Sequence, residues 1–303
     1  MLEIKDFQSK IVTLLGDISL KLDEPMSKHT SFRIGGPADV MVFPSSTEEL
    51  AKVLKVSALL DCERYILGAG TNILAPDEGV RGVVICLKDS LGGMTRLSDN
   101  SIYVGGGVTM TRAAVYAAGL GLSGLEFAHG IPGTVGGGVY MNAGAYGGEI
   151  CQVCSAVDVM TMDGQLVRYS VDEMNFAYRH SRLEDEFAIV VGAEFNLTAK
   201  PETEIRAQMQ DLMNRRKTSQ PLDMPSAGSA FKRPVGGYAA ALIDQAGLKG
   251  FSVGKAAIST KHAGFAVNLG GATAQDVKEL LKEVSQRVFD HSGIRLEPEV
   301  RVW

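Results

Sequence analysis

Two glycine-rich segments could bind the phosphates of a nucleotide. Residues 68–72 (GAGTN) follow a strand-like run, and residues 130–138 read GIPGTVGGG. Glycine lets the backbone approach a ligand closely, and successive backbone N–H groups can form a nest for a phosphate. The first segment lacks the third glycine of a Rossmann fingerprint, and no helix clearly starts there. Two separated nests therefore predict a dinucleotide with an extended diphosphate, and crowded strand–loop packing without a ligand is the alternative.

Three further segments carry polar groups suited to an anionic substrate. Arg179, next to Tyr178, can bind a carboxylate or a phosphate through two parallel hydrogen bonds, although a solvated loop explains this segment equally well. Ser229 lies in a turn of small residues that could hold its hydroxyl toward a ligand, but such turns are more often only structural. Glu299 would titrate abnormally if it were buried, but a carboxylate there usually pairs with a neighbour such as Arg301.

Metal and redox chemistry have weaker support. Cys151 and Cys154 have the spacing of a redox motif, but no second cysteine pair or histidine cluster completes a zinc site. We interpret this spacing as coincidence. The five histidines lie at no metal-ligand spacing, so we assign no metal. The four cysteines are few for the length, and reduced thiols fit best.

The elements that must position these groups begin with an α/β pattern. Residues 39–44 predict a strand, and Ser46 with Glu49 predicts a capping box ahead of a helix. Residues 64–67 and 83–87 predict two further strands. The region after residue 88 is mainly β, with one Ala-rich helix and a hairpin signal at Asp163-Gly164. Its expected elements are strand 102–104, helix 111–118, an alternating segment 157–169 and strand 188–197.

The last third begins after a helix over residues 202–213, followed by an RRK run and a proline-punctuated segment. Residues 274–289 have the stripe of an amphipathic helix, and Thr273 with Asp276 predicts its capping box. The other expected elements are helix 239–243, strand 263–269 and a terminal strand over 295–303.

Composition limits the function classes. A chain of 303 residues exceeds what one core usually serves, and 45% hydrophobic with 21% charged residues is ordinary for a folded protein. The formal net charge of −5 gives no general attraction for nucleic acid or an anionic membrane. No apolar run approaches the roughly 18 to 20 residues of a membrane span, and the N-terminus has no signal-peptide core. We therefore expect a cytoplasmic protein with neither partner.

Taken together and in this order, the motifs resemble the UDP-N-acetylenolpyruvoylglucosamine reductases, in particular their shorter class (type II). The resemblance covers nearly the whole chain. It includes HTSFRIGGPA at 29–38, the segment at 68–72, residues 131–149 with MNAGAYGG at 141–148, Tyr178-Arg179, the Ser229 turn, KHAGF at 261–265 and EPEVR at 297–301.

The resemblance implies a mixed α/β and α+β chain with an FAD-binding fold of the vanillyl-alcohol-oxidase type. Its two subdomains would be residues 1–88 and 89–200, and an α+β substrate-binding domain would be residues 201–303. It further implies noncovalent FAD. NADPH would reduce the flavin, leave, and be replaced by UDP-N-acetylglucosamine enolpyruvate, which would receive the hydride from flavin N5. The product, UDP-N-acetylmuramate, serves peptidoglycan synthesis.

The resemblance also assigns roles to residues. Arg179 and Glu299 would polarise the substrate carboxylate and stabilise an enolate-like intermediate, and Ser229 would protonate the carbon that bears the ether oxygen. Lys232 or Arg233 could stabilise the serine alkoxide. The residues expected at the cofactor are Gly68, Ala69, Gly70, Thr71, Asn72, Ile131, Pro132, Gly133, Thr134, Gly136, Gly137 and Asn142. Those expected at the substrate are Tyr178, Lys217, Lys232 and Arg301, with Lys255 and Lys261 as further candidates for the diphosphate.

Some features depart from the family pattern. Arg233 stands where many members carry asparagine, and Gly138 replaces a common alanine. After Arg179 there is no insertion like the tyrosine loop of the longer class, so the UDP-sugar must be held otherwise. Two rival functions stay open: an oxidase of the same flavin fold, which needs a base, and a flavin- or nucleotide-binding module without turnover.

Overall fold

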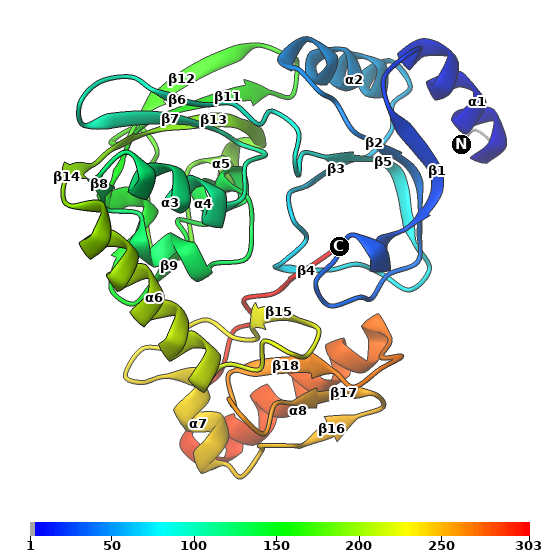
Figure 1. The fold of residues 1–303 in the computed structure, drawn as a ribbon. Helices are drawn as coiled ribbons and strands as arrows, with labels where there is room; N and C mark the ends of the chain where they lie inside the picture. Colours follow the sequence, from blue (N-terminus) through cyan, green and yellow to red (C-terminus); the bar gives the residue numbers. More distant parts are fainter. Residues whose placement is uncertain (1–3) are drawn as a thin grey trace. The chain divides into compact units, whose positions relative to one another are not determined.

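The structure, a computed structural model, describes residues 4–303 and divides the chain into two units (Figure 1). Unit 1 contains residues up to Leu22, Val40–Ala69 and Gly82–Arg215, and unit 2 contains Asp23–Asp39, Gly70–Arg81 and Arg216–Trp303. Each unit is therefore assembled from segments far apart in the sequence. The predicted division at residues 88 and 200 remains a prediction.

Unit 1 contains a five-stranded sheet with the strand order β12-β11-β13-β7-β6. The strands are β6 (Met94–Arg96), β7 (Ser101–Gly105), β11 (Cys154–Thr161), β12 (Leu166–Ser170) and β13 (Ala188–Asn196). The predicted Asp163-Gly164 hairpin is confirmed, because Met160 of β11 pairs antiparallel with Leu166 of β12. Gly164 takes a φ of 84°, a conformation that glycine adopts without steric cost.

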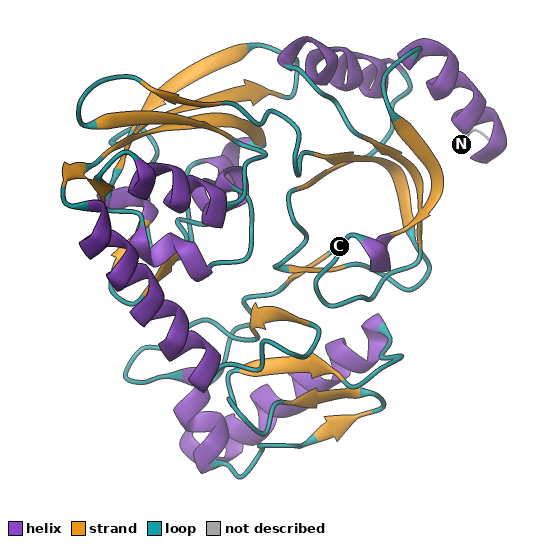
Figure 2. Cartoon of the chain, in the orientation of Figure 1, coloured by secondary structure: helices purple, strands orange, loops and turns teal. Residues whose placement is uncertain are grey.

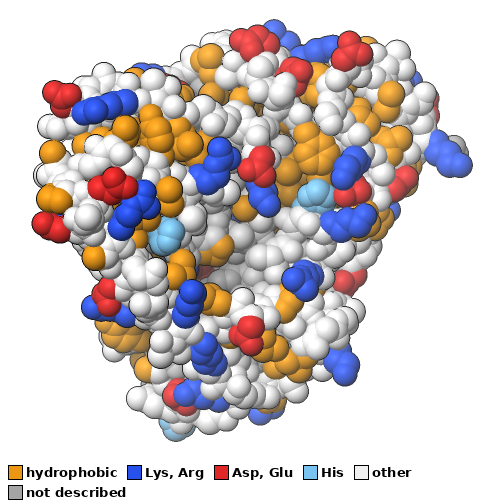
Figure 3. Space-filling view, viewed as in Figure 1, with side chains coloured by type: hydrophobic (Ala, Val, Ile, Leu, Met, Phe, Trp, Pro, Cys, Tyr) orange, Lys and Arg blue, Asp and Glu red, His pale blue; other side chains and the backbone are white. Residues whose placement is uncertain are grey.

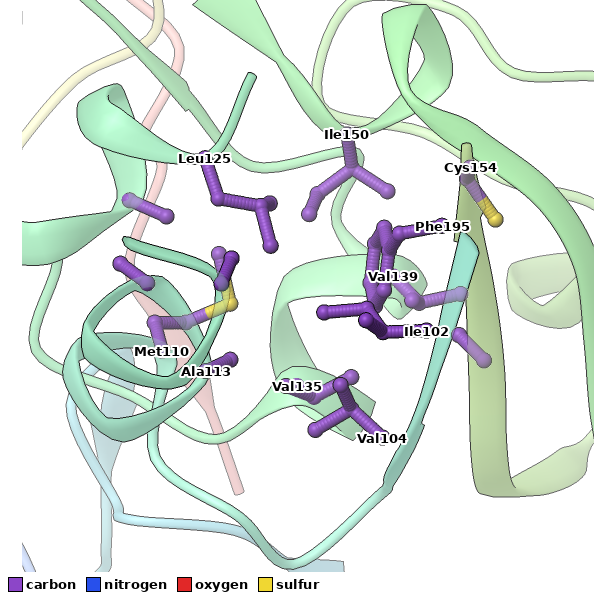
Figure 4. Packing of buried hydrophobic residues seen from close by; sticks show 14 of the residues in the cluster. Ile102, Val104, Met110, Ala113, Leu125, Val135, Val139, Ile150, Cys154 and Phe195 are labelled. Atoms are coloured by element: carbon purple, nitrogen blue, oxygen red, sulfur yellow. The ribbon is translucent and has the colours of Figure 1, made fainter. Parts of the chain in front are cut away.

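Two helices cover one face of this sheet: α3 (Met110–Gly119) and α4 (Val135–Tyr140) (Figure 1). Val135 and Val139 of α4 point into a core that also contains Ile102 of β7 and Phe195 of β13 (Figure 4). All four side chains are at most 1% exposed. Their burial holds α4, and with it the second glycine-rich segment, against the sheet.

A second core of unit 1 lies around α1 (Ile4–Leu15) and α2 (Thr47–Leu59), which pack against each other. Only half of the predicted capping box of α2 is confirmed. The Ser46 hydroxyl accepts a hydrogen bond from the Glu49 N–H, but the Glu49 carboxylate accepts from the Ser45 N–H. Buried leucines and valines of α2 contact Val83 and Ile85 in this core. The associated strands are β1 (Leu20–Pro25), β2 (Pro37–Val42), β3 (Arg64–Leu67) and β5 (Val80–Cys86), in the sheet order β1-β2-β5-β3.

Unit 2 contains a four-stranded sheet, β15-β18-β17-β16, with helix α8 (Ala274–Ser292) against it (Figure 2). The capping box of α8 is confirmed, because Thr273 accepts from the Asp276 N–H and Asp276 accepts from the Thr273 N–H. The other elements of this core are β15 (Ser226–Ser229), α7 (Ala239–Gln245), β16 (Ser252–Val253), β17 (Ala256–Ile258) and β18 (Phe265–Asn268).

The remaining elements are mostly short. They are η1 (Met26–Lys28), β4 (Ile73–Leu74), β8 (Leu122–Ser123), η2 (Glu126–Gly130), β9 (Gly144–Ala145), β10 (Gly148–Glu149), η3 (Ile150–Gln152), α5 (Leu183–Glu186), β14 (Thr198–Ala199), α6 (Glu202–Ser219) and β19 (Arg301–Val302).

Two predicted boundaries are wrong. Helix α6 runs through the RRK segment to Ser219, because Arg and Lys are good helix formers. The predicted terminal strand over 295–303 shrinks to Arg301–Val302, which pairs in parallel with β4. Pro298 lacks a backbone N–H for a regular ladder, and it makes only an isolated bridge with Phe231.

The surface carries charges of both signs. On the face drawn in Figure 3, Lys and Arg side chains are interspersed with Asp and Glu. This face therefore presents, over the residues that the structure describes, no extended patch of one sign, consistent with the formal net charge of −5. Within residues 4–303, no helix combines the length and the apolar character that crossing a membrane requires.

Candidate active site

In unit 1 the two glycine-rich segments meet. A Cβ atom on Gly68 would lie 2.6 Å from the Thr134 Oγ1, which is closer than real Cβ contacts. Thr134 is buried and caps α4, since its hydroxyl accepts a hydrogen bond from the Gly137 N–H at 3.3 Å. Glycine at position 68 therefore lets the first segment touch the second, as a ligand that contacts both would require.

Next to this contact, two backbone donors are available. The Val135 and Gly136 N–H groups donate to the carbonyl oxygens of Val108 and Gly106, at 2.8 Å each. The N–H groups of Gly133 and Thr134 make no hydrogen bond within the part of the chain that the structure describes. Gly133, with a φ of 156°, is only partly buried. The segment thus combines a tightly packed base with two backbone donors that bond no other described protein group, as a phosphate-binding backbone requires.

Residues 70–72 of the first segment belong to unit 2, where they are bound to other chain segments. A Cβ on Gly70 would lie 2.0 Å from the His29 carbonyl oxygen, so glycine is needed for the close approach. The Asn72 side-chain amide donates to the Glu299 carbonyl oxygen at 3.2 Å, and the Arg301 N–H donates to the Asn72 carbonyl oxygen at 3.0 Å. Asn72 therefore holds the C-terminal segment that carries Glu299.

Ser229 and Glu299 lie on neighbouring segments of unit 2. Ser229 ends β15, and the next residue, Ala230, accepts a hydrogen bond from the Glu299 N–H at 2.9 Å. Two residues on, the Lys232 N–H donates to the Glu297 carbonyl oxygen at 2.9 Å, and the two side chains form an ion pair. The Ser229 side chain is exposed and Glu299 is half-buried. The structure thus places the predicted acid, Glu299 and Lys232 on two paired segments.

Arg179 belongs to unit 1 and occupies a two-residue turn. The Ala177 and His180 backbones exchange hydrogen bonds of 3.1 and 3.2 Å around Tyr178 and Arg179. Arg179 takes a φ of 55°, which is uncommon for a residue with a side chain. Its Nη2 donates to the Gly144 carbonyl oxygen at 3.2 Å, and its guanidinium carbon lies 4.9 Å from the centre of the Tyr178 ring.

The remaining candidate cations of unit 2 are on its surface. The Lys261 Nζ donates to the Lys217 carbonyl oxygen at 2.6 Å, so two predicted diphosphate ligands are neighbours. The Lys255 side chain is exposed, and the Lys255 N–H donates to Asp276. Arg301 is half-buried in β19.

Two structural anchors have roles that residue types alone do not reveal. The Ser31 hydroxyl donates to the Ser226 carbonyl oxygen at 2.6 Å, which fixes β15 next to the 29–38 motif. The Asn142 side chain, predicted at the cofactor, bonds Glu149, Cys151 and Ala177. Ser31 belongs to the HTSFRIGGPA motif, but the residue that it bonds, Ser226, lies 195 residues away in the sequence. A contact that distant has no local signal.

Cys151 and Cys154 form no disulfide in the structure. Cys154 is buried at the edge of the main core, where burial raises the pKa of its thiol to about 12 (Figure 4). Burial also raises the pKa of the more exposed Cys151. Both directions disfavour the thiolate that redox chemistry needs, which supports the interpretation of the spacing as coincidence. Within residues 4–303, no three His, Cys, Asp or Glu side chains are grouped as metal ligands.

We predict that Cys154 resists alkylation. At pH 8 a thiol with a pKa of about 12 has a thiolate fraction roughly a thousandfold below that of an ordinary thiol. Because the pKa is raised, the rate should increase as pH rises from 7 to 10. Mass spectrometry after iodoacetamide treatment of the folded protein should find Cys154 unmodified when Cys151 has begun to react. Equal labelling, or rapid disulfide formation between the two under mild oxidation, contradicts this prediction.

Comparison with known proteins gives matches over both units. Residues 38–170 match a family model described as an FAD binding domain, and residues 220–303 match the C-terminal domain of UDP-N-acetylenolpyruvoylglucosamine reductase. A relative of that name from Syntrophomonas wolfei is 45% identical over 97% of this chain and 98% of its own length. One from Agathobacter rectalis is 44% identical over 98% of each chain.

A solved structure supports the same relationship. The crystal structure of UDP-N-acetylenolpyruvylglucosamine reductase (MurB) from Thermus caldophilus aligns with a TM-score of 0.77 and 37% identity. The alignment covers 94% of this chain and 98% of that one. The predicted fold class is therefore confirmed: an FAD-binding fold followed by a C-terminal α+β domain.

Proposed function

Because the chain belongs to the UDP-N-acetylenolpyruvoylglucosamine reductase family, an FAD-dependent oxidoreductase family, we propose that it uses NADPH to reduce UDP-N-acetylglucosamine enolpyruvate to UDP-N-acetylmuramate. The observation that carries this proposal is identity of 44 to 45% over 97 to 98% of the chain. The reaction would serve peptidoglycan precursor synthesis. We assign it to the cytoplasm, where the four unpaired cysteines would stay reduced.

The residues present fit FAD. A dinucleotide has an extended diphosphate, and unit 1 joins two glycine-rich segments at Gly68 and Thr134 with the donors of Gly133 and Thr134 beside the contact. These donors and Gly68 would hold the diphosphate. Bound FAD supplies hydride transfer, taking a hydride from NADPH and delivering it to the enolpyruvyl double bond. Neither glycine-rich segment, 68–72 or 130–138, contains a histidine or cysteine to which the flavin could be attached covalently. We therefore expect noncovalent binding.

Arg179 has the task of stabilising charge. Hydride addition at the CH₂ carbon converts it to a methyl group and moves an electron pair toward the substrate carboxylate, which gives an enolate-like intermediate. A guanidinium can form two parallel hydrogen bonds with that carboxylate, and these strengthen as negative charge develops. The hydrogen bonds that hold the Arg179 turn support this role, because a donor already in place needs little reorganisation during the reaction.

Glu299 and Ser229 complete the reaction. Glu299, if it holds a proton, donates a hydrogen bond to the same carboxylate. The Ser229 Oγ–H then transfers its proton to the carbon that bears the ether oxygen. This forms the second new C–H bond of the product. The serine alkoxide recovers a proton from solvent. Lys232 could stabilise the alkoxide by its charge, although its ion pair with Glu297 would have to loosen; Arg233 is the alternative.

A steady-state assay tests the proposal. Under air, NADPH oxidation should be fast only when the enolpyruvyl sugar is added, and mass spectrometry should detect the product two hydrogens heavier. Fast NADPH oxidation with oxygen alone would support the oxidase alternative. Bound flavin without turnover would support the binding module.

The Gly68 contact gives a prediction about the cofactor. We expect Gly68→Ala to weaken FAD binding about tenfold to a hundredfold, because the added methyl would overpack against Thr134 at a cost of about 1 to 3 kcal/mol. The flavin-to-protein absorbance ratio after gel filtration measures the loss. Gly119→Ala is the matched control, since its Cβ would meet nothing within 4 Å at the exposed end of α3. Equal flavin retention in both variants removes Gly68 from the cofactor site.

A further inference from the structure

Asn142 is a buried hydrogen-bonding centre of unit 1. Its side chain is 1% exposed. The amide nitrogen donates to the Ala177 carbonyl oxygen at 3.0 Å and to the Glu149 carboxylate at 3.1 Å, and the amide oxygen accepts from the Cys151 N–H at 3.0 Å. A carbonyl oxygen needs a donor and a backbone N–H needs an acceptor, so these partners fix the orientation of the amide. Both amide hydrogens are therefore used within the protein.

The contact with Ala177 is one of three that attach the Arg179 turn to a single segment. From residues 140 to 144, every second residue contributes one bond. The Tyr140 carbonyl oxygen accepts from the buried Ser181 hydroxyl at 2.8 Å, and the Gly144 carbonyl oxygen accepts from the Arg179 Nη2 at 3.2 Å. The three contacts reach residues before, within and after the turn, so this segment determines where Arg179 lies.

The turn needs this support. Arg179 is the third residue of the turn from Ala177 to His180 and has a positive φ. Type II turns usually carry glycine or asparagine at this position. A strained backbone persists only when surrounding contacts hold it, and such strain is often found at functional sites. Asn142 itself has a φ of 42°, which asparagine tolerates better than most residues.

We propose that Asn142 is a positioning residue for Arg179 and not a ligand of the cofactor. This inference rests on the proposed function, since Arg179 acts on the substrate carboxylate. Removing the Asn142 amide should misplace the guanidinium and slow the step in which the enolpyruvyl sugar is reduced. Reduction of the flavin by NADPH, which does not use that carboxylate, should be unaffected.

The test begins with Asn142→Gly, because glycine keeps the positive φ while the side chain and its amide are removed. We expect unchanged FAD content and unchanged flavin reduction by NADPH, with reoxidation by the enolpyruvyl sugar slowed about a hundredfold, as misplacement by about 1 Å can cause. Asn175→Gly is the matched control, because Asn175 also has a positive φ (46°) and is exposed near the same turn. Loss of FAD from Asn142→Gly would overturn the proposal in favour of a cofactor ligand.

A double-mutant cycle makes the assignment specific. In an Arg179→Ala background, Asn142→Gly should change reoxidation by less than about twofold, because the guanidinium it positions is gone. Full additivity overturns the proposal. If Asn142→Gly does not fold, Ser181→Ala removes another anchor of the same turn, and it should give the same separation between the two half-reactions.

Hydrogen exchange supplies a readout that needs no turnover. The His180 N–H donates to Ala177, the residue that Asn142 holds, so its exchange should accelerate about tenfold or more in Asn142→Gly and remain unchanged in Asn175→Gly. Unchanged exchange at His180 overturns the positioning role. If the wild-type protein fails to reduce the enolpyruvyl sugar while His180 exchange still responds, the proposed function fails and the structural link between Asn142 and the turn stands.

Discussion

Replacing Ser229 with alanine is expected to slow turnover by about a hundredfold to ten thousandfold, the usual contribution of a positioned proton donor. The loss should appear only after the hydride has been delivered, since the Ser229 hydroxyl protonates the remaining carbon. Flavin reduction by NADPH should stay at the wild-type rate. Without oxygen, stopped-flow absorbance should show wild-type rates for flavin reduction by NADPH and for flavin reoxidation by the enolpyruvyl sugar. Rapid-quench measurement of the product should show the loss.

The control for this variant is Ser252→Ala, an exposed serine of β16 in the same sheet of unit 2. It should match the wild type in both half-reactions. Wild-type turnover in Ser229→Ala removes the serine from catalysis. Slower flavin reduction in Ser229→Ala would instead indicate a role in NADPH binding.

Arg179→Lys is expected to reduce the rate with the enolpyruvyl sugar by about a hundredfold to a thousandfold although the charge is conserved. Lysine cannot form two parallel hydrogen bonds to one carboxylate, and it cannot reproduce the planar contact with Tyr178. The loss should fall mainly on kcat, because the interaction strengthens as charge develops in the transition state. Steady-state kinetics with the enolpyruvyl sugar as the varied substrate separate kcat from KM.

Arg182→Lys is the matched control for this change. Arg182 is three residues away and also lies over a tyrosine, with its guanidinium carbon 4.5 Å from the Tyr169 ring centre. It should retain wild-type kinetics, because nothing places its side chain in the reaction. Unchanged kinetics in Arg179→Lys would remove the bidentate role of Arg179.

Local patterns predicted much of the fold. The apolar stripe of α8 and its Thr273 cap gave a helix that the structure places at Ala274–Ser292. The Asp163-Gly164 hairpin and strand β3 were also predicted in place. The local sequence is enough to predict these elements, because a cap, a turn dipeptide or a regular apolar period depends on residues close in sequence.

Helix α4 could not be predicted, because three of its six residues are glycine, which disfavours a helix. It forms through contacts distant in sequence: the Gly136 N–H bonds the Gly106 carbonyl oxygen, and Val139 is buried in the core. Gly138 lies against Met110, where an added Cβ would be 2.8 Å from the methionine sulfur. Alanine at this position would therefore require a different packing of Met110.

In the candidate site, too, local sequence predicted some features and contacts distant in sequence determine the others. Residue types predicted which groups could do chemistry, but the bonds that hold them join residues far apart in the chain. Asn142 and Ala177 are 35 residues apart, and Asn72 and Glu299 are 227 apart. Only the folded chain reveals that Asn142 and Asn72 hold the segments bearing Arg179 and Glu299.

An anaerobic absorbance titration tests the central claim most directly. The purified protein should show the flavin absorbance at about 450 nm, lose it when NADPH is added, and regain it when UDP-N-acetylglucosamine enolpyruvate follows. Loss and recovery together would demonstrate both half-reactions in one sample. Loss without recovery would contradict the proposed substrate, and a protein without the flavin absorbance would contradict the cofactor site itself.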